Sequence, residues 1–571
     1  MNKKLLTMGL AALLMAGCSS DDVVVGEGDN GGTSAVKGYV GLTITMPTGA
    51  DSRAVSYDDG ETGEYKVNDV TLVFSEWNAG TSKHDIVQVT KLTPADWQKE
   101  GTGTDDITSL SVLPVLPVVN KNAKSVLVLV NSSEVFEVVS STYDAATGNN
   151  KVVTPGSIKL IGAGSSYTTI EDLEAAQTPS AADKYYGTTG GWFMANASIK
   201  NALNLDSHDN HKQLVTIEPK NSKEAAMADA GKNVIYVERA VAKVSLTLNN
   251  NSEDSHEFTC TGPGFDHDKV TIDGWALDIT NKSTFPLRRI NASWPDLDRF
   301  APAPAVGRPQ RYEWSEDNNY STYAPATDFW RAAAAAESCS NSLYCLENTF
   351  DKDHMKQDGT TRAILRGQYV PDGIAQGEVN TNGIFRLGES VTFYSKADML
   401  AKVKAAVVAS GVVAEGEIQS VDVQSLHIGK ADFTYNGAQN KIVVTKTDAS
   451  TVDLSGKIDA IKGILGQLTY YVKGYCYYPV RIRHFADAVA PYADGVSAWN
   501  AGNTYDTDEK WLGRYGVVRN NSYVINVTSV KAPGSPTIPE PTQNIDDEQF
   551  YYIQATVKVL SWTKRSQNVE L

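Results

Sequence analysis

Basic residues are scarce in this sequence. Lys and Arg number 51 against 68 Asp and Glu, which gives a formal net charge of −17 at pH 7, and no cluster of Lys and Arg stands out along the chain. Nucleic acids and anionic membrane surfaces are held by such clusters. The sequence therefore argues against nucleic acid as a partner. Its net negative charge favours solubility and points to no particular partner.

The short motifs of common enzyme and metal sites are also missing. There is no Gly-x-Ser-x-Gly elbow and no Walker loop, and none of the 8 histidines stands in a zinc-protease pattern. His208 and His211 are close together, but a polar loop explains them better than a metal, since no further ligand has suitable spacing. We expect no catalytic residue, metal or cofactor, although a glycosidase needs only two carboxylates.

Strongly periodic helical patterns are rare, whereas Tyr, Thr, Val and Gly are abundant. Short apolar runs bounded by turn residues recur, which is typical of antiparallel β-sandwiches. We therefore predict a mainly β protein, with one good helix at 398–410 and a short Ala-rich one at 331–337. The clearest strand candidates are 70–74, 112–119, 125–130, 234–248, 363–369, 474–482 and 515–530.

The N-terminus has the pattern of an export signal. Lys3 and Lys4 precede an apolar stretch at 5–16 that is too short to span a bilayer, and small residues then lead to Cys18. This end resembles a lipobox, in which the chain is cut before an acylated cysteine, and the alternative is an ordinary signal peptide with a stray cysteine. The Ser and Asp run at 19–22 resembles a surface-export tag or is a solvated tether.

A first strand is predicted shortly after this tether, and we read it as an edge strand. Apolar residues alternate there with Gly41, Thr43 and Thr45, as in a strand packed on a core. The apolar positions of this first strand are Val40, Leu42, Ile44 and Met46. A turn-rich loop at 47–52 follows and ends at Arg53, in the kind of segment that proteases cut.

The C-terminus combines a proline-rich spacer with a last strand. Four prolines between 533 and 541 predict a stiff, extended segment. The strand after it has alternating apolar positions, at Ile553, Ala555, Val557 and Val559. A strand on such a spacer pairs either within its own domain or with another molecule, and the pattern alone leaves both open.

Beyond Cys18 the chain has Cys260, Cys339, Cys345 and Cys476. Export permits disulfides, and Cys339 and Cys345 are near enough in sequence to bridge a loop. Buried free thiols are at least as good an interpretation, because four cysteines allow three pairings.

A few stretches are distinctive enough to compare with known families. The most specific is 513–525, GRYGVVRNNSYVI, which is followed by Gly534 and the proline spacer. Supporting stretches lie at 237–244, 344–349, 475–480 and 559–562. These stretches resemble the fimbrillins, the major subunits of type V pili of Gram-negative anaerobes, and especially the stalk subunit of the short or minor fimbriae.

The resemblance implies two transthyretin-like antiparallel β-sandwich domains in tandem, with a few short helices and a C-terminal donor-strand tail. The polar cluster at 250–257 marks the expected boundary between the domains. The expected division is a signal peptide at 1–17, a lipidated tether with the first strand at 18–53, an N-terminal domain at 54–255, a C-terminal domain at 256–530, and the spacer and last strand at 531–571.

The resemblance also implies a route of assembly. The precursor would reach the outer membrane as a lipoprotein with palmitate on Cys18, and an arginine-specific protease would cut between Arg53 and Ala54. Removing 18–53 would strip the first strand out of its sandwich and leave unpaired backbone groups around an apolar groove. The last strand of another copy would then insert its four apolar positions there, head to tail, and a fibre would grow.

The implied partners are other copies of the chain, the anchor and tip subunits of the fimbria, the maturation protease and, before cleavage, the outer membrane. The implied role is structural and not enzymatic, in a cell-surface fimbrium that supports adhesion and biofilm formation. The competing hypotheses are a fimbrial tip or anchor adhesin and a surface glycan-binding or glycan-cleaving lipoprotein. Tryptophans that could stack on sugars, but that fit a core or an interface better, are Trp275, Trp294, Trp314, Trp330 and Trp499.

Overall fold

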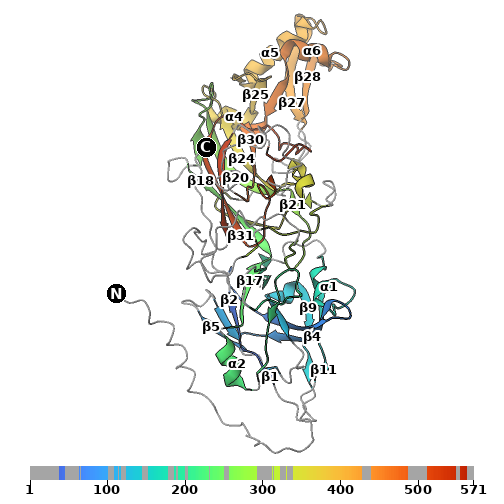
Figure 1. Ribbon diagram of the computed structural model, residues 1–571. Helices are drawn as coiled ribbons and strands as arrows, with labels where there is room; N and C mark the ends of the chain where they lie inside the picture. The colour runs from blue at the N-terminus through green and yellow to red at the C-terminus, as the bar shows by residue number, and fades with distance from the viewer. Residues whose placement is uncertain are drawn as a thin grey trace, which may run out of the picture.

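The computed structural model describes residues 38–45, 64, 66–100, 109–112, 115–116, 124–143, 152–177, 186–187, 191–199, 204–220, 222–230, 232–249, 256–291, 311–312, 314–321, 329–330, 338–426, 439–485, 511–547 and 553–561. Strands dominate their regular structure, which confirms the predicted mainly β class. The molecule is elongated, and its N-terminal sheet lies at the opposite end from a unit built around α5 and α6 (Figure 1). No described helix combines the length and apolar character that a membrane crossing needs.

The first unit comprises the described residues up to Arg239. Its main sheet has the order β4 (Lys83–Leu92), β3 (Val70–Asn78), β8 (Ser125–Val130), β15 (Met194–Asn196), β17 (Val234–Arg239), β2 (Leu42–Thr45), β6 (Ser109–Val112) and β5 (Trp97–Glu100), and β16 (Val215–Thr216) also pairs with β8. Smaller pairs are β1 (Gly38–Tyr39) with β7 (Val115–Leu116), β9 (Phe136–Val139) with β12 (Ser157–Leu160), β10 (Thr142–Tyr143) with β11 (Val152–Thr154), and β13 (Tyr186–Gly187) with β14 (Gly191–Trp192). Its helices are α1 (Ile170–Glu174) and α2 (Lys223–Ala230).

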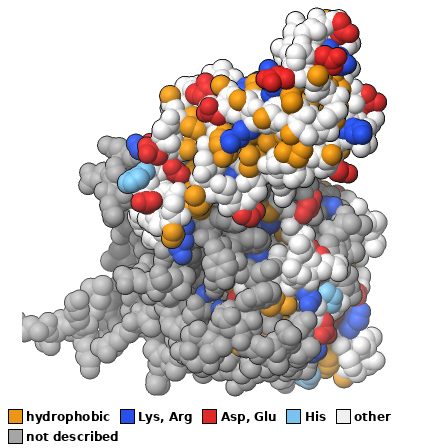
Figure 2. Space-filling model, turned by 90° about the horizontal axis from the view of Figure 1, so that it is seen from above, with side chains coloured by type: hydrophobic (Ala, Val, Ile, Leu, Met, Phe, Trp, Pro, Cys, Tyr) orange, Lys and Arg blue, Asp and Glu red, His pale blue; other side chains and the backbone are white. Residues whose placement is uncertain are grey.

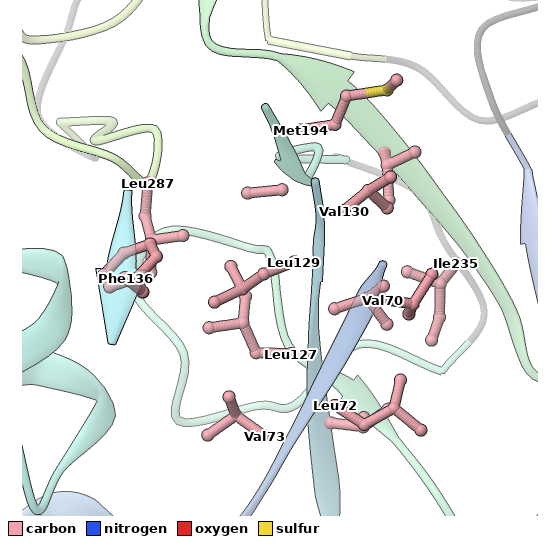
Figure 3. Packing of buried hydrophobic residues seen from close by; sticks show 14 of the residues in the cluster. Val70, Leu72, Val73, Leu127, Leu129, Val130, Phe136, Met194, Ile235 and Leu287 are labelled. Atoms are coloured by element: carbon pink, nitrogen blue, oxygen red, sulfur yellow. The ribbon is translucent and has the colours of Figure 1, made fainter. Parts of the chain in front are cut away.

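The centre of this sheet is buried on both faces. β8 reads SVLVLV, and all 6 of its residues are buried. A continuous apolar run of this kind fits a strand covered on both sides, whereas a half-exposed strand alternates. In Figure 3 the side chains of Leu127 and Leu129 lie toward Phe136 of β9, while Val70 lies beside Ile235 of β17. The core of the first unit therefore extends on both sides of β8.

The second unit is a sandwich of two four-stranded sheets. One sheet has the order β23 (Leu343–Leu346), β18 (Val241–Leu248), β31 (Asn521–Val530) and β32 (Ile553–Ser561), and the other β19 (Glu257–Thr259), β20 (Lys269–Asp278), β24 (Arg362–Val370) and β30 (Tyr475–Arg481). The pair β21 (Thr280–Asn281) with β22 (Phe329–Trp330) and α4 (Gln376–Asn382) complete it. Its core contains the fully buried aromatic rings of Trp275, Tyr369, Tyr478 and Tyr523.

An inserted unit, residues 384–471, lies between β24 and β30 in the chain. It contains a sheet of β26 (Phe393–Tyr394), β25 (Ile384–Leu387) and β29 (Leu468–Tyr471), the pair β27 (Ile418–Leu426) and β28 (Gln439–Lys446), and the helices α5 (Lys396–Ala409) and α6 (Ile458–Leu465). Met399, Val403 and Ile461 belong to a core of its own. α5 begins where the Ser395 side chain accepts a hydrogen bond from the Asp398 amide, 3.2 Å away, and it confirms the predicted helix. Seen from above, hydrophobic, acidic and basic side chains are interspersed over this end (Figure 2).

Short 3₁₀ helices connect several of these strands. They are η1 (Ser132–Glu134), η4 (Lys352–His354), η5 (Gln357–Gly359), η6 (Glu415–Glu417) and η7 (Val472–Gly474). The Ala-rich helix predicted at 331–337 lies outside the described residues.

The chain passes from the first unit to the second at Ala240. β17 pairs with β15 and β2, whereas β18, which begins at Val241, pairs with β23 and β31. β18 therefore belongs to the second unit, although the sequence placed it in the N-terminal domain that ends at 255. β18 ends at Leu248, and residues 250–255 of the polar cluster lie outside the described residues. The passage between the two sheets at Ala240 lies inside an apolar run without any change of composition.

The four described cysteines are buried free thiols, so the disulfide considered for Cys339 and Cys345 is not formed. Both side chains belong to the core of the second unit. Burial raises the pKa of Cys339 to about 11 and that of Cys345 to about 12, which keeps both thiols protonated and unreactive.

Candidate assembly site

The first strand lies inside its sheet and not at the edge that the alternating pattern predicted. β2 pairs in parallel with β17, where Ile44 lies opposite Ile235, and antiparallel with β6, where Ile44 lies opposite Leu110. Alternation reports which residues face the core but does not report how many neighbours a strand has, so the edge assignment was wrong. Withdrawing β2 would therefore open a slot with a row of unpaired backbone groups on each side.

The apolar positions of this strand are among the most buried in the molecule. Val40 is 1% exposed, and Leu42 and Ile44 are 0% exposed, which confirms the core-facing pattern. Burying three such side chains stabilises the first unit by an amount on the order of 5 to 9 kcal/mol. Met46, Arg53, Ala54 and Cys18 lie outside the described residues.

Polar contacts to the segment around α2 hold β1 and β2 in place. The amides of Tyr39 and Lys220 donate to each other's carbonyl oxygens at 2.7 and 2.8 Å. Asn233 Nδ2 donates to the Gly41 carbonyl at 3.0 Å, and Thr43 Oγ1 donates to the Ala230 carbonyl at 3.1 Å. All these partners lie between 220 and 233, so one segment clamps the whole strand.

Gly41 allows α2 to lie directly on this strand. A Cβ atom at position 41 would be 2.2 Å from the Ala226 carbonyl oxygen and 2.9 Å from the Ala230 Cβ. Neither contact can be relieved by rotating a side chain, because the first partner is a backbone atom and the second is the Cβ of an alanine. Glycine therefore lets α2 lie this close to β2 while β2 occupies the sheet.

Glu64 fixes the chain at the junction between the first and second units. Its carboxylate accepts a hydrogen bond from Tyr344 Oη at 2.6 Å and lies 3.0 Å from Lys243 Nζ, and both ionic side chains are 3% exposed. Its carbonyl oxygen accepts from Arg239 Nη2 at 3.0 Å. The chain is thus held at Glu64 by residues of β17, β18 and β23. These contacts do not depend on the residues that precede Arg53.

The GRYGVVRNNSYVI stretch has a structural role beside this junction. Arg519 is 1% exposed, and its Nε lies 3.0 Å from a Glu347 carboxylate oxygen. Burial acts to raise the pKa of Glu347, but Arg519 and Arg288 outweigh it and hold the pKa below its usual value. Gly516 has φ +131, and a Cβ there would lie 2.7 Å from the Trp314 ring. The stretch therefore stabilises the turn that leads into β31.

The last strand pairs within its own unit. β32 is antiparallel to β31, with Val559 opposite Tyr523, Val557 opposite Ile525 and Ala555 opposite Val527. The three β31 residues are 0% exposed, so the register places the predicted donor positions opposite core residues. β32 is an edge strand, because β31 is its only partner among the described strands.

The proline spacer lies along the second unit. The amides of Ser535 and Tyr477 donate to each other's carbonyl oxygens at 3.0 and 2.8 Å. Arg362 Nη2 donates to the Pro539 carbonyl at 2.7 Å, and Asp547, which is fully buried, accepts from Arg514 Nε at 2.8 Å. The proline-rich segment is therefore packed against the second unit as far as residue 547.

Sequence reasoning missed the residues that hold the first strand. Gly41 carries a usable signal, since a glycine inside an alternating strand often marks a close backbone approach. Lys220 and Asn233 carry none, because their roles depend on contacts far along the chain. Trp275 and Trp314 are 0% and 1% exposed, as expected for core residues.

Comparison with known proteins gives a sequence match in the second unit. Residues 469–568 match the family model described as "Major fimbrial subunit protein type IV, Fimbrillin, C-terminal". No curated protein sequence matches the chain.

The solved structures to which the chain is similar include three fimbrial proteins. A fimbrilin of Porphyromonas gingivalis has 13% identity and a TM-score of 0.32, with 92% of this chain and 99% of that one covered. The tip fimbrial protein of the same organism has 10% identity and a TM-score of 0.30, over 92% and 100%. A fimbrial assembly protein of Parabacteroides distasonis has 12% identity and a TM-score of 0.26, over 58% and 85%.

TM-scores this low support no inference about how this chain is arranged, so the assignment rests on the sequence match. That match covers β30, β31 and β32, which include the turn stabilised by Arg519 and the terminal strand. Residues 469–568 of the chain are therefore similar to the C-terminal part of the fimbrillins, a family of fimbrial subunits.

Proposed function

We propose that this chain is the stalk subunit of a surface fimbria, that it is exported as a lipoprotein acylated on Cys18, and that it polymerises after cleavage between Arg53 and Ala54. The observation that carries the proposal is the interior position of β2. The strand precedes Arg53 in the chain, has a neighbour on each side, and is buried at Val40, Leu42 and Ile44. Its removal would leave a slot that only another strand can fill.

Cleavage at Arg53 would release the strand without releasing the rest of the chain. Glu64 is tied to Lys243 and Tyr344 at the unit junction. The mature N-terminus would therefore stay attached beyond this point, while β1 and β2 would keep only non-covalent contacts and could leave. The contacts with Lys220, Asn233 and Ala230 would then be open to a replacement.

The proposed replacement is β32 of another copy. Its alternate positions Ile553, Ala555, Val557 and Val559 supply apolar side chains at the same spacing as the first strand. A strand that runs in the direction of β2 would restore the ladders with β17 and β6. The slot is in the first unit and the donor is in the second, so the contact is head to tail and continues without closing.

This assembly would place the chain in a cell-surface fimbrium, with the anchor and tip subunits at its ends. Adhesion and biofilm formation would follow from the fibre as a whole and need no catalytic residue in the shaft. The precursor would contact the outer membrane only through its lipid.

The test is mass spectrometry of the N-terminus of material sheared from cells, together with SDS gels of boiled and unboiled samples. Chains that start at Ala54 and form ladders only without boiling, and whose ladders vanish on truncation after Gln549, are the expected result. Chains that keep an acylated Cys18 and form no ladder would replace the proposal with an anchor or a glycan-binding lipoprotein.

A further inference from the structure

A pocket of about 230 Å³ lies in the first unit, away from β2. It is formed around the end of β3, the start of β4, α1 and the loop at 206–214, and Arg289 reaches it from the chain that follows β21. β4 is at one end of the main sheet, and β17, β15, β8 and β3 separate it from β2. The pocket is therefore distinct from the assembly site.

Glu174, at the end of α1, lines this pocket with a nearly buried side chain that has no hydrogen bond. The side chain is 8% exposed, and the nearest basic atom is His211 Nε2 at 3.9 Å, beyond hydrogen-bonding distance. His211 is a poor counter-ion, because burial lowers its pKa and leaves it neutral. Burial, with Asp209 and Glu171 nearby, raises the pKa of Glu174 well above its usual value.

The other carboxylates of the pocket already have partners. Glu171 accepts the His84 amide at 3.0 and 2.9 Å and lies 2.7 Å from His84 Nδ1. Asp209 accepts three backbone amides, those of His211 at 2.8 Å, Gln213 at 2.5 Å and Leu214 at 2.6 Å. Among the three carboxylates that line the pocket, Glu174 is therefore the one whose two oxygen atoms accept no hydrogen bond.

When Glu174 is ionised, the side chains that line the pocket have one more negative charge than positive charges. Glu171, Asp209 and an ionised Glu174 are opposed by Arg289 and His84. Burial acts to lower the pKa of His84, but Asp206 and Glu171 outweigh it and raise the pKa to about 9, so His84 is charged at neutral pH. A single positive charge would balance this set. Among the described residues, no group of three or more side chains has the arrangement of a metal site.

Apolar groups complete the lining. Trp77, Ala175 and Leu214 face the same pocket, and the Trp77 ring is held by stacking on His208, with ring centroids 4.3 Å apart. The lining therefore suits a ligand that has an apolar part, the stem, and a charged part, the head. The stem meets apolar side chains, and the head meets one free carboxylate.

We infer that this pocket binds a single primary ammonium group on an apolar stem, with Glu174 as its counter-ion. The class includes a lysine side chain of another polypeptide and a free alkylamine. A divalent metal does not fit, because the described residues contain no group of three or more side chains arranged to hold one. Stacking of a sugar on Trp77 is hindered, because His208 is stacked on that ring and His84 lies tilted against it.

Binding is coupled to the proton on Glu174. The groups facing that carboxyl are Asp209 and Glu171, which favour its neutral form, His84 and Arg289, which favour the anion, and neutral His211. An entering ammonium requires the anion, so Glu174 must release its proton. Affinity therefore rises with pH as long as the pH is below the raised pKa of Glu174.

The test is calorimetric titration of the full chain with n-pentylammonium, with 1-pentanol as the neutral probe of equal stem length. Glu174→Gln imitates the neutral carboxyl and should fold normally, as thermal unfolding checks. Glu218→Gln is the control, because its side chain is 84% exposed. We expect wild type and E218Q to bind n-pentylammonium, 1-pentanol not to bind, and E174Q to bind about tenfold or more weakly, since a charge-assisted contact is lost.

Two further measurements sharpen the result. Wild type titrated in buffers of different ionisation enthalpy should release a proton on binding, and E174Q should not. Binding of Nα-acetyl-lysine N-methylamide would identify a polypeptide lysine as the ligand source, whereas binding of n-pentylammonium alone would identify free amines. Equal affinity of wild type and E174Q, or no heat with either amine, would overturn the inference.

Discussion

Strands β2 and β32, near the two ends of the described chain, differ in how they are held. β2 lies between two partners, under α2, whereas β32 lies at an edge and pairs with β31 alone among the described strands. An interior strand that leaves exposes both neighbours, while an edge strand that leaves exposes one. Under the proposed assembly, a cut at Arg53 would therefore open a slot with two unpaired neighbours, and β32 would be the strand that is easier to donate.

The largest effect is expected from Arg53→Ala. Without the cut, β2 stays covalently attached and fills its own slot, so no donor can enter and ladders on unboiled gels should be absent. Ser52→Ala, next to the cleavage site, is the control and should leave the ladders intact. Normal ladders from R53A would show that β2 need not be released by this cut.

Glu64→Gln should destabilise both the precursor and the cleaved chain. The variant removes the carboxylate that lies 3.0 Å from the buried Lys243 ammonium, and breaking one side of a buried pair costs about 3 to 5 kcal/mol. Denaturant unfolding measures the loss. Glu218→Gln, on an exposed side chain, should change stability by less than about 0.5 kcal/mol.

Leu42→Ala should distinguish the precursor from the mature chain. It removes a side chain that is 0% exposed, and such a change costs about 2 to 5 kcal/mol where β2 is present. A chain that starts at Ala54 lacks residue 42, so the substitution cannot affect it. Its free energy of unfolding is the reference value for a first unit without β2. If L42A left the precursor unchanged in denaturant unfolding, the first strand could not be the main support of this unit.

Gly41→Ala should have a smaller effect of the same kind. The new Cβ would press on Ala226 and Ala230, and overpacking of this sort costs about 1 to 3 kcal/mol. Because the strain lies between β2 and α2, the variant should also release β2 faster after cleavage. Pulsed hydrogen exchange on 222–230 would measure this, and unchanged protection would argue that α2 does not hold the strand.

Much of this arrangement could be predicted from local pattern. The alternating residues Val40, Leu42 and Ile44 defined a core-facing strand, and the run at 234–248 was correctly expected to be extended. Neighbour relations could not be predicted in the same way. Whether β2 has one partner or two depends on β6 and β17, which are distant in sequence and recognisable only after the sheet has formed.

Other errors have the same cause. The polar cluster at 250–257 looked like a boundary, but the crossing at Ala240 is hidden inside an apolar run because each half of that run is core to a different sheet. The inserted unit at 384–471 was not separated from its host, since its strands have the composition of the surrounding ones. Among the residues that hold β1 and β2 in place, Gly41 could be recognised from its neighbours in the sequence, whereas Lys220 and Asn233 could not.

The direct passage from β17 to β18 determines how a subunit responds to pulling. A fibre exposed to flow carries tension, and in the proposed fibre this tension would reach the second unit through Ala240, because β18 begins two residues after β17 ends. β18 and β31 are parallel, so a pull along β18 shears their hydrogen bonds together instead of opening them one at a time. The junction between the two units should therefore not lengthen under tension, and any lengthening of the fibre should come from the contacts between subunits.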